Sequence, residues 1–208
     1  MFDLSPEELR ILKPLKNPRK VQDFLDSLPV NFEKKGETYM SPRRALRAKK
    51  AHCFEGALLA ALAFWLHGER PLLMDFTTTA DDEDHVVALF KENGYWGAVS
   101  KTNHAILRYR DPVYSSPKEL AMSYFHEYYM FEDGRKTLVS FSHPFDLSTL
   151  NPDWITDEKD LDRIADALDD SPHIKVVPKE NAKRIRKASK IELEAGALTE
   201  WKKTNPRT

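Results

Sequence analysis

One run of apolar residues limits the folds open to this chain more than any other feature. Residues 53–66, CFEGALLAALAFWL, place apolar side chains on almost every face of a helix. A helix without a polar face has to be covered by other elements on most of its sides. Its longest uninterrupted apolar stretch, 57–66, is too short to cross a bilayer, which takes about 20 residues. The run therefore predicts a central buried helix and no membrane partner.

Helix start signals come before this run. Ser5, Asn17 and Ser41 are each followed by a proline, a residue favoured at the first position of a helix. Residues 29–40 show no regular pattern. We therefore expect three helices before the central one, the last of them within SPRRALRAKK (41–50).

Strand patterns follow the central helix. PLLMDFTTT (71–79), HVVALFK (85–91) and YWGAVSK (95–101) are expected to be strands, and Asn93-Gly94 is a strong hairpin signal between the last two. The second run lacks alternation of polar and apolar residues, which indicates burial on both faces. Further elements are expected downstream: sheet segments at 104–114 and 137–147, and helices at 117–130, 157–169 and 180–202.

This order of elements predicts an α+β fold in which the central buried helix packs on a mainly antiparallel sheet. The 208 residues are expected to form a single domain. The composition, 41% hydrophobic and 31% charged, is typical of a globular protein. The net charge of −1 gives no general attraction to nucleic acid.

Charge is unevenly distributed. Residues 43–50 and 179–190 are basic, whereas 153–170 are acidic. We interpret these segments as solvated faces and expect the basic helix 180–202 to dock on the acidic segment; a protein partner is the alternative. A single cysteine excludes an internal disulfide, and the N-terminus lacks the pattern of a secretory signal, so a cytoplasmic protein is expected.

That single cysteine, Cys53, opens the central helix. Backbone N–H groups at a helix start have no partner inside the helix, and the helix dipole adds positive potential there. Arg47, Lys49 and Lys50 lie just upstream and strengthen this field. Cysteine is also a small hydrophobe that is often buried and inert. The position nevertheless favours a thiolate nucleophile.

A histidine and a polar residue complete a candidate catalytic group. His85 stands at the start of a strand, where its side chain can face a cleft and act as a base for Cys53. If residues 93–94 form a two-residue loop, Thr102 lies opposite His85 and Ser100 lies diagonally on the same face. A three-residue loop would bring Asn103 opposite His85 instead. Ser100, Thr102 and Asn103 are thus the candidates for orienting the imidazole.

Other motifs carry less chemistry. DDEDH (81–85) contains possible metal ligands, but neighbours on an extended chain point in opposite directions, so we interpret it as a solvated acidic loop. The aromatic-rich region 109–131 could stack nucleic-acid bases, but its mixed periodicity favours core packing. The chain has seven glycines and no phosphate-binding loop motif. We therefore expect no metal and no cofactor.

The pattern resembles the transglutaminase-like branch of the papain-fold cysteine proteases. The resemblance rests on a cysteine that opens a buried helix (HCFEGALLAALAFWL), a histidine that opens a following strand (DHVVALF) and a next strand that ends in polar residues (YWGAVSKTN). It covers about residues 39–115, which would form the catalytic core. Residues 1–38 would then add N-terminal helices, and 116–208 a helix, strand and helix addition.

The resemblance implies cysteine-dependent acyl transfer, with hydrolysis of an amide or peptide as the expected reaction. Cys53 would be the nucleophile and His85 the base; the substrate would be a peptide or amide, or a small acyl acceptor. The family's third member is an Asp near the end of the second strand, where this chain has Ser100 with Asn103 just beyond. The Cys53 backbone N–H would stabilise an oxyanion, with Tyr39 or His52 as an added donor. The alternative is a catalytically degenerate binding module.

Overall fold

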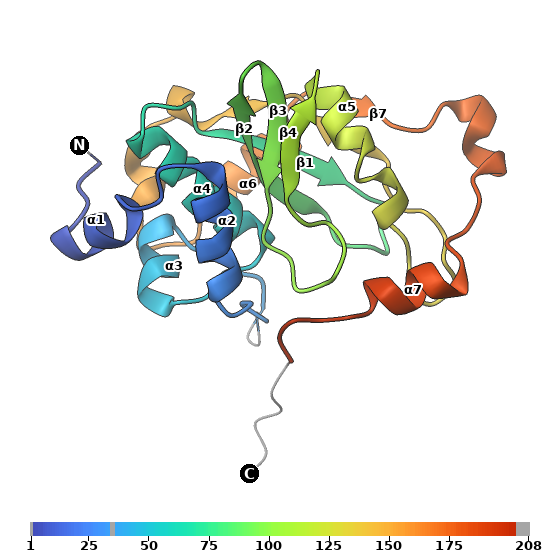
Figure 1. The fold of residues 1–208 in the computed structure, drawn as a ribbon, viewed down its shortest axis with the longest axis horizontal. Helices are drawn as coiled ribbons and strands as arrows, with labels where there is room; N and C mark the ends of the chain where they lie inside the picture. The colour runs from blue at the N-terminus through green and yellow to red at the C-terminus, as the bar shows by residue number, and fades with distance from the viewer. Residues whose placement is uncertain (1, 34–35, 203–208) are drawn as a thin grey trace, which may run out of the picture.

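The structure, a computed structural model, describes residues 2–33 and 36–202 (Figure 1). Its strands are β1 (Leu72–Thr77), β2 (His85–Glu92), β3 (Tyr95–Val99), β4 (Arg110–Tyr114), β5 (Ser140–Ser142), β6 (Phe145–Asp146) and β7 (His173–Lys175). The described strands form one seven-stranded sheet in the order β4-β3-β2-β1-β5-β7, and β6 also pairs with β1. Every strand pair is antiparallel, as the sequence predicted for most of the sheet.

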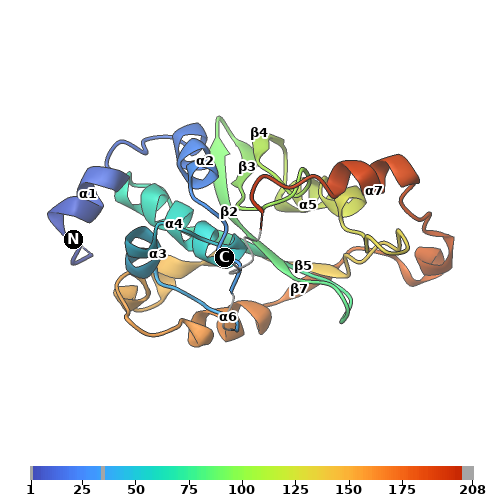
Figure 2. The same ribbon diagram turned by 90° about the horizontal axis from the view of Figure 1, so that it is seen from below.

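Helices lie on both faces of the sheet. They are α1 (Pro6–Leu12), α2 (Pro18–Ser27), α3 (Pro42–Ala48), α4 (Cys53–Leu66), α5 (Pro117–Met122), α6 (Asp162–Asp169) and α7 (Lys190–Gly196). The side chains of α1–α4 and α6 share one apolar core with the sheet, and those of α5 share a second core on its opposite face. Figure 2 shows α7 on the same side of the molecule as α5, away from α1 and α3.

Helix α4 is the centre of the larger core. Every residue from Phe54 to Phe64 is buried, as the apolar run predicted. The helix lies against β2, and α2 and α3 cover its other sides. At its C-terminal end the ring of Trp65 stacks on the fully buried Trp154, with 6.2 Å between centroids. In the described part of the chain, no helix combines the length and the apolar character that crossing a membrane would need.

Three predicted helices are shorter than expected. The 117–130 helix ends at Met122, because Tyr124, Phe125 and Tyr128 pack into the second core beneath the sheet. The 157–169 helix begins only at Asp162, since the preceding residues are bonded to the 39–41 segment: Ser41 Oγ donates to the Asp157 carbonyl and the Leu161 N–H donates to the Tyr39 carbonyl.

The 180–202 segment also differs from the single helix that was predicted. It divides into a 3-10 turn, Lys179–Arg184, and helix α7, whose start is fixed by a capping box between Ser189 and Glu192. Between 104 and 114 the only described strand is β4, beside an isolated antiparallel bridge from His104 to Thr199, and the 137–147 segment splits into β5 and β6.

The expected docking of the basic C-terminal segment on the acidic segment is wrong. The acidic residues are instead paired with α3: Arg44 bonds Asp160 at 2.8 Å and Arg47 bonds Glu158 at 2.9 Å. The C-terminal segment lies elsewhere, where Tyr129 Oη donates to the Glu192 carbonyl. The basic run 43–50 was therefore the correct partner, because α3 begins directly after the 39–41 segment that holds the acidic stretch.

A glycine allows close packing between β3, β2 and β4. A Cβ at Gly97 would overlap the Phe90 ring and approach the Arg110 carbonyl oxygen to 2.7 Å. We expect Gly97→Ala to lower the free energy of unfolding by about 1–3 kcal/mol through overpacking, measured by urea denaturation. Phe90→Leu should lower the free energy of unfolding by less in the Gly97→Ala background than in wild type. Strict additivity of the two changes would contradict this packing explanation.

Candidate active site

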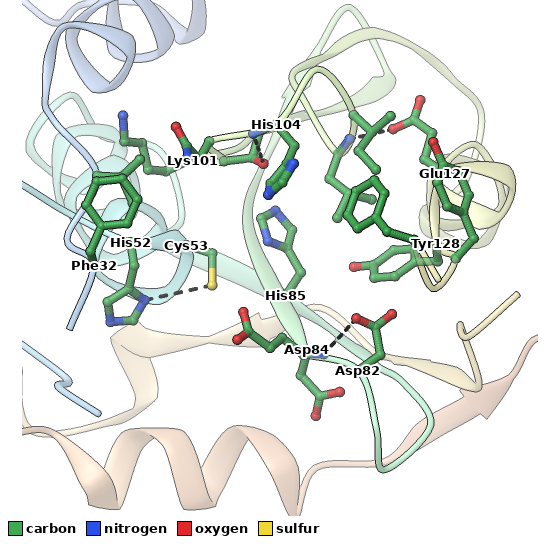
Figure 3. A pocket seen from close by; sticks show the side chains of 18 of the residues that line it. Phe32, His52, Cys53, Asp82, Asp84, His85, Lys101, His104, Glu127 and Tyr128 are labelled. Carbon is green, nitrogen blue, oxygen red and sulfur yellow. Dashed lines mark hydrogen bonds between the residues drawn. The ribbon is translucent and has the colours of Figure 1, made fainter. Parts of the chain in front are cut away.

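The start of α4, the start of β2 and the segment that follows β3 meet at one cavity. The cavity has a volume of about 550 Å³, and Cys53, His52 and His85 line it. Figure 3 shows the Cys53 sulfur between the two imidazole rings, with Asp84 below them and Tyr128 across the cavity. Cys53 is half-buried and His85 is buried. Cys53 and His85 therefore line one cavity although 32 positions separate them, and the orienting candidates Thr102 and Asn103 line it as well, whereas Ser100 does not.

His85 is held in one tautomer by its neighbours. Its Nε2 lies 2.8 Å from Ser100 Oγ, and that hydroxyl donates its own hydrogen to the Leu107 carbonyl at 2.5 Å. Because the Ser100 hydrogen is already committed, Oγ must accept from the His85 Nε2–H. In the neutral ring Nδ1 then carries the lone pair and can take the thiol proton; once protonated, it donates to the thiolate. This is the tautomer a base needs if Nδ1 is to serve the thiol.

The hairpin geometry decides between the predicted orienting residues. Glu92 pairs with Tyr95, so residues 93–94 form a two-residue loop and the three-residue alternative is wrong. Ser100 reaches His85 from this register. The Thr102 hydroxyl instead accepts from the His104 N–H. Ser100 alone of the three candidates hydrogen-bonds the imidazole among the described residues.

Asn103 has a different role from the one predicted. Its side chain donates to the Trp201 carbonyl at 3.0 Å and accepts from the Trp201 N–H at 2.8 Å. Neighbouring bonds join the Ala105 N–H to the Leu198 carbonyl and the Glu200 N–H to the Asn103 carbonyl. Asn103 thus attaches the C-terminal segment to a loop that lines the cavity.

Sequence reasoning missed Gln22, which fixes Ser100. This α2 side chain accepts from the Ser100 N–H at 3.0 Å and donates to the Ser100 carbonyl at 2.8 Å. A bidentate amide of this kind holds the Ser100 peptide in one orientation. The available signal was a glutamine next to Val21 in the apolar stripe of this helix, where a buried polar group needs partners.

A buried carboxylate holds the start of α4. Glu55 is fully buried and accepts from the N–H groups of His52 (3.0 Å) and Met40 (3.2 Å), from Thr38 Oγ1 and from Asn31 Nδ2. Burial raises the pKa of Glu55 above its ordinary value despite these bonds. The network joins Asn31, Thr38 and Met40 to the first turn of α4 and so sets the position of Cys53.

The thiol is strongly biased toward its ionised form. Burial opposes ionisation of Cys53, but hydrogen bonds from His52 and His85 and the positive charges of the two rings hold its pKa well below the usual value. Nearby cations and hydrogen-bond donors have this effect because they stabilise the thiolate over the thiol. His52 Nδ1 lies 3.8 Å from Cys53 Sγ. The predicted thiolate therefore has two imidazole partners, of which sequence reasoning identified one.

Of the two side chains expected to stabilise an oxyanion, Tyr39 and His52, only His52 lines the cavity. The Tyr39 hydroxyl donates to Glu37 Oε2, and Tyr39 does not line the cavity. His52 lines the cavity, but its ring nitrogens face Cys53 and the Thr38 carbonyl. Tyr128 lines it as well; it is 2% exposed and its hydroxyl has no hydrogen-bond partner in the described part of the chain. Tyr128 is a donor that sequence reasoning did not single out.

The acidic loop is ordered by threonines. Asp84 accepts from the Thr78 N–H and hydroxyl, Thr137 Oγ1 donates to Asp82, and Arg135 pairs with Asp81. Over residues 2–33 and 36–202, no group of three or more His, Cys, Asp or Glu side chains is arranged to hold a metal ion. The loop instead forms one wall of the cavity.

Removing the Ser100 hydroxyl should loosen His85. If Cys53 and His85 act as nucleophile and base on an amide, we expect Ser100→Ala to lower kcat about 10- to 100-fold, because the imidazole loses the group that fixes its orientation, while KM changes little. Steady-state kinetics provide the test. Ser27→Ala is a matched control, since Ser27 Oγ also donates to a backbone carbonyl but lies on exposed α2 surface. Equal kcat values for the two variants would contradict a role of the Ser100 hydroxyl in orienting His85.

Comparison of the sequence with protein-family models and with curated proteins finds no match. The functional interpretation therefore rests on the geometry of the site.

Proposed function

We propose that this protein is a cysteine-dependent acyl-transfer enzyme of transglutaminase-like type, most simply an amide or peptide hydrolase. One observation carries the proposal: the only thiol of the chain lies at the start of a buried helix, between two imidazoles, in a cavity large enough for a substrate. The helix and strand order agrees with a transglutaminase-like fold, which is part of the proposal. A free thiol suits a reducing compartment, so we place the activity in the cytoplasm.

The chemistry follows from the proton positions. The Cys53 proton moves to His85 Nδ1, and the thiolate sulfur attacks the substrate carbonyl carbon. As the C–S bond forms, the π electrons move to oxygen, which the Cys53 backbone N–H can stabilise. When these electrons return to re-form the carbonyl, the C–N bond breaks and the amine leaves with the proton from His85. Water or a second amine then loses its proton to His85 while attacking the thioester, and Cys53 leaves as thiolate.

The cavity walls indicate the character of the substrate. Ile106, Leu107, Tyr128 and Phe131 supply an apolar wall, and residues 81–84 supply carboxylates. Within the described residues, Asp82 and Asp84 have hydroxyl and N–H partners but no ion pair. A peptide or amide with an apolar side chain and a nearby basic group matches both walls.

Acyl-enzyme trapping tests the proposal. The protein is mixed with p-nitrophenyl acetate, and we expect a burst of p-nitrophenolate together with one acetyl group on the peptide that contains Cys53, detected by mass spectrometry. Cys53→Ser is the control for non-specific acetylation. Absence of a Cys53 adduct would contradict acyl transfer and favour a binding module, for which the serine in place of the family's Asp is the supporting observation.

A further inference from the structure

Two histidines flank one sulfur atom, and their surroundings differ. The sulfur of Cys53 lies between the rings of His52 and His85 (Figure 3). His52 Nδ1 is 3.8 Å from Sγ. A hydrogen bond to His85 also stabilises the thiolate. A single base is enough to move one proton, so the second ring requires an explanation.

The far side of the His52 ring faces only acceptors. Nε2 lies 2.6 Å from the Thr38 carbonyl oxygen, 3.5 Å from Glu55 Oε1 and 3.6 Å from Glu33 Oε1. A carbonyl cannot donate, so Nε2 carries a hydrogen. The two carboxylates favour a positive charge on the ring. On the Nδ1 side of the His52 ring, the Cys53 thiolate also favours a positive charge on the ring.

The far side of the His85 ring is different. Its Nε2 bonds the neutral Ser100 hydroxyl, which in turn donates to a backbone carbonyl. Among the described residues no carboxylate lies within ion-pair distance of this ring. Apart from the thiolate itself, His85 therefore has no charged partner among the described residues, whereas loss of a proton from His52 would leave the carboxylates as well as the thiolate without their cation.

We propose that His52 is a second catalytic histidine, which keeps its proton throughout the reaction and stabilises the Cys53 thiolate, while His85 alone carries the moving proton. This division of labour rests on the proposed acyl-transfer function. No bond is made or broken at His52: the thiol proton goes to His85, and His52 acts through its charge on the reacting sulfur.

The charges around His52 agree with this role. Burial lowers the pKa of His52, but the hydrogen bond and charge of Cys53, the charge of Glu55 and the Thr38 carbonyl together raise it to about 10. The titratable groups that face the ring are Cys53 and Glu55 from α4, Glu33 from the loop before α3, and His85 across the sulfur. Lys49 and Lys50, just upstream, are exposed to solvent.

The test measures the pH midpoint of Cys53 alkylation by iodoacetamide, read by mass spectrometry. We expect His52→Gln to raise the midpoint by about 1–3 pH units, the usual effect of removing an adjacent opposite charge. His85→Gln should leave the midpoint below the value of about 8.5 of a free cysteine but lower acyl turnover by a factor of about 10²–10⁴. His67→Gln, at the exposed opposite end of α4, is the matched control and should change neither.

Turnover separates the two roles. In His52→Gln, acylation of Cys53 should recover toward the wild-type rate as the pH rises past the new midpoint, because the thiolate then forms without His52 and His85 still moves the proton. An unchanged midpoint in His52→Gln, or a free-cysteine midpoint in His85→Gln, would overturn the proposal. A low, His52-dependent midpoint without any acyl adduct would instead contradict the acyl-transfer function and leave the ion pair standing.

Two further measurements apply if His52→Gln does not fold. His52→Lys restores a positive charge and should retain a low midpoint. In the wild-type protein, ¹⁵N NMR of the imidazoles should show both His52 nitrogens protonated at neutral pH, and alkylation of Cys53 should lower the pH at which they titrate. A neutral His52 ring at neutral pH would overturn the proposal.

Discussion

Replacing Cys53 with alanine is expected to lower kcat for an amide substrate by a factor of about 10⁶, the loss that follows removal of the nucleophile from a hydrolytic triad. The single cysteine makes this result easy to interpret, because no other thiol can take over. Steady-state turnover of a peptide amide, before and after the substitution, measures it.

A separate control must show that the Cys53→Ala variant is folded. Cys53 is the first residue of α4 and only half-buried, so alanine should be tolerated there. Far-UV circular dichroism and Tm should match those of wild type. A folded Cys53→Ala protein with undiminished turnover would show that the chemistry takes place elsewhere.

The second large effect is expected at His85. We expect His85→Gln to lower kcat by a factor of about 10²–10⁴, the usual contribution of a general acid and base. KM should change less, since the ring acts on the proton rather than on substrate binding. Kinetics over a range of pH provide the measurement.

A double variant strengthens this test. Residues that act as one catalytic unit lose activity non-additively, so Cys53→Ala combined with His85→Gln should be no slower than Cys53→Ala alone. Independent, multiplying losses would mean that His85 supports the fold of the site rather than proton transfer. His85 is buried at the start of β2, opposite Phe76, so Tm should be recorded for each variant.

Rules of local structure were sufficient to predict the main parts of the site from the sequence. A helix with apolar residues all round has to be buried, and a cysteine at its first residue sits beside free N–H groups whatever the remaining fold. The Asn93-Gly94 turn determined the register of β2 and β3, and the period of two along a strand then brought Ser100 to the face of His85. Each inference needed only residues close in sequence or joined by a tight turn.

The failures share a physical cause. Asn103 was a sound chemical choice, but its amide is bonded to Trp201, 98 positions later, and no local pattern announces such a contact. Gln22 reaches Ser100 across 78 positions for the same reason. The helices predicted at 117–130 and 180–202 end early because aromatic burial and pairing with the 103–105 loop outweigh helix propensity.

The sequence by itself determined that a lone thiol opens a buried helix and that a histidine opens a strand two elements later, because helix burial, capping and hairpin register are local properties. Only the tertiary structure decided what surrounds each imidazole: Thr38, Glu33 and Glu55 beside His52, and Ser100 beside His85. The strength and sign of an electrostatic effect depend on distance and burial in three dimensions. The different roles proposed for the two histidines could therefore be read only from the folded chain.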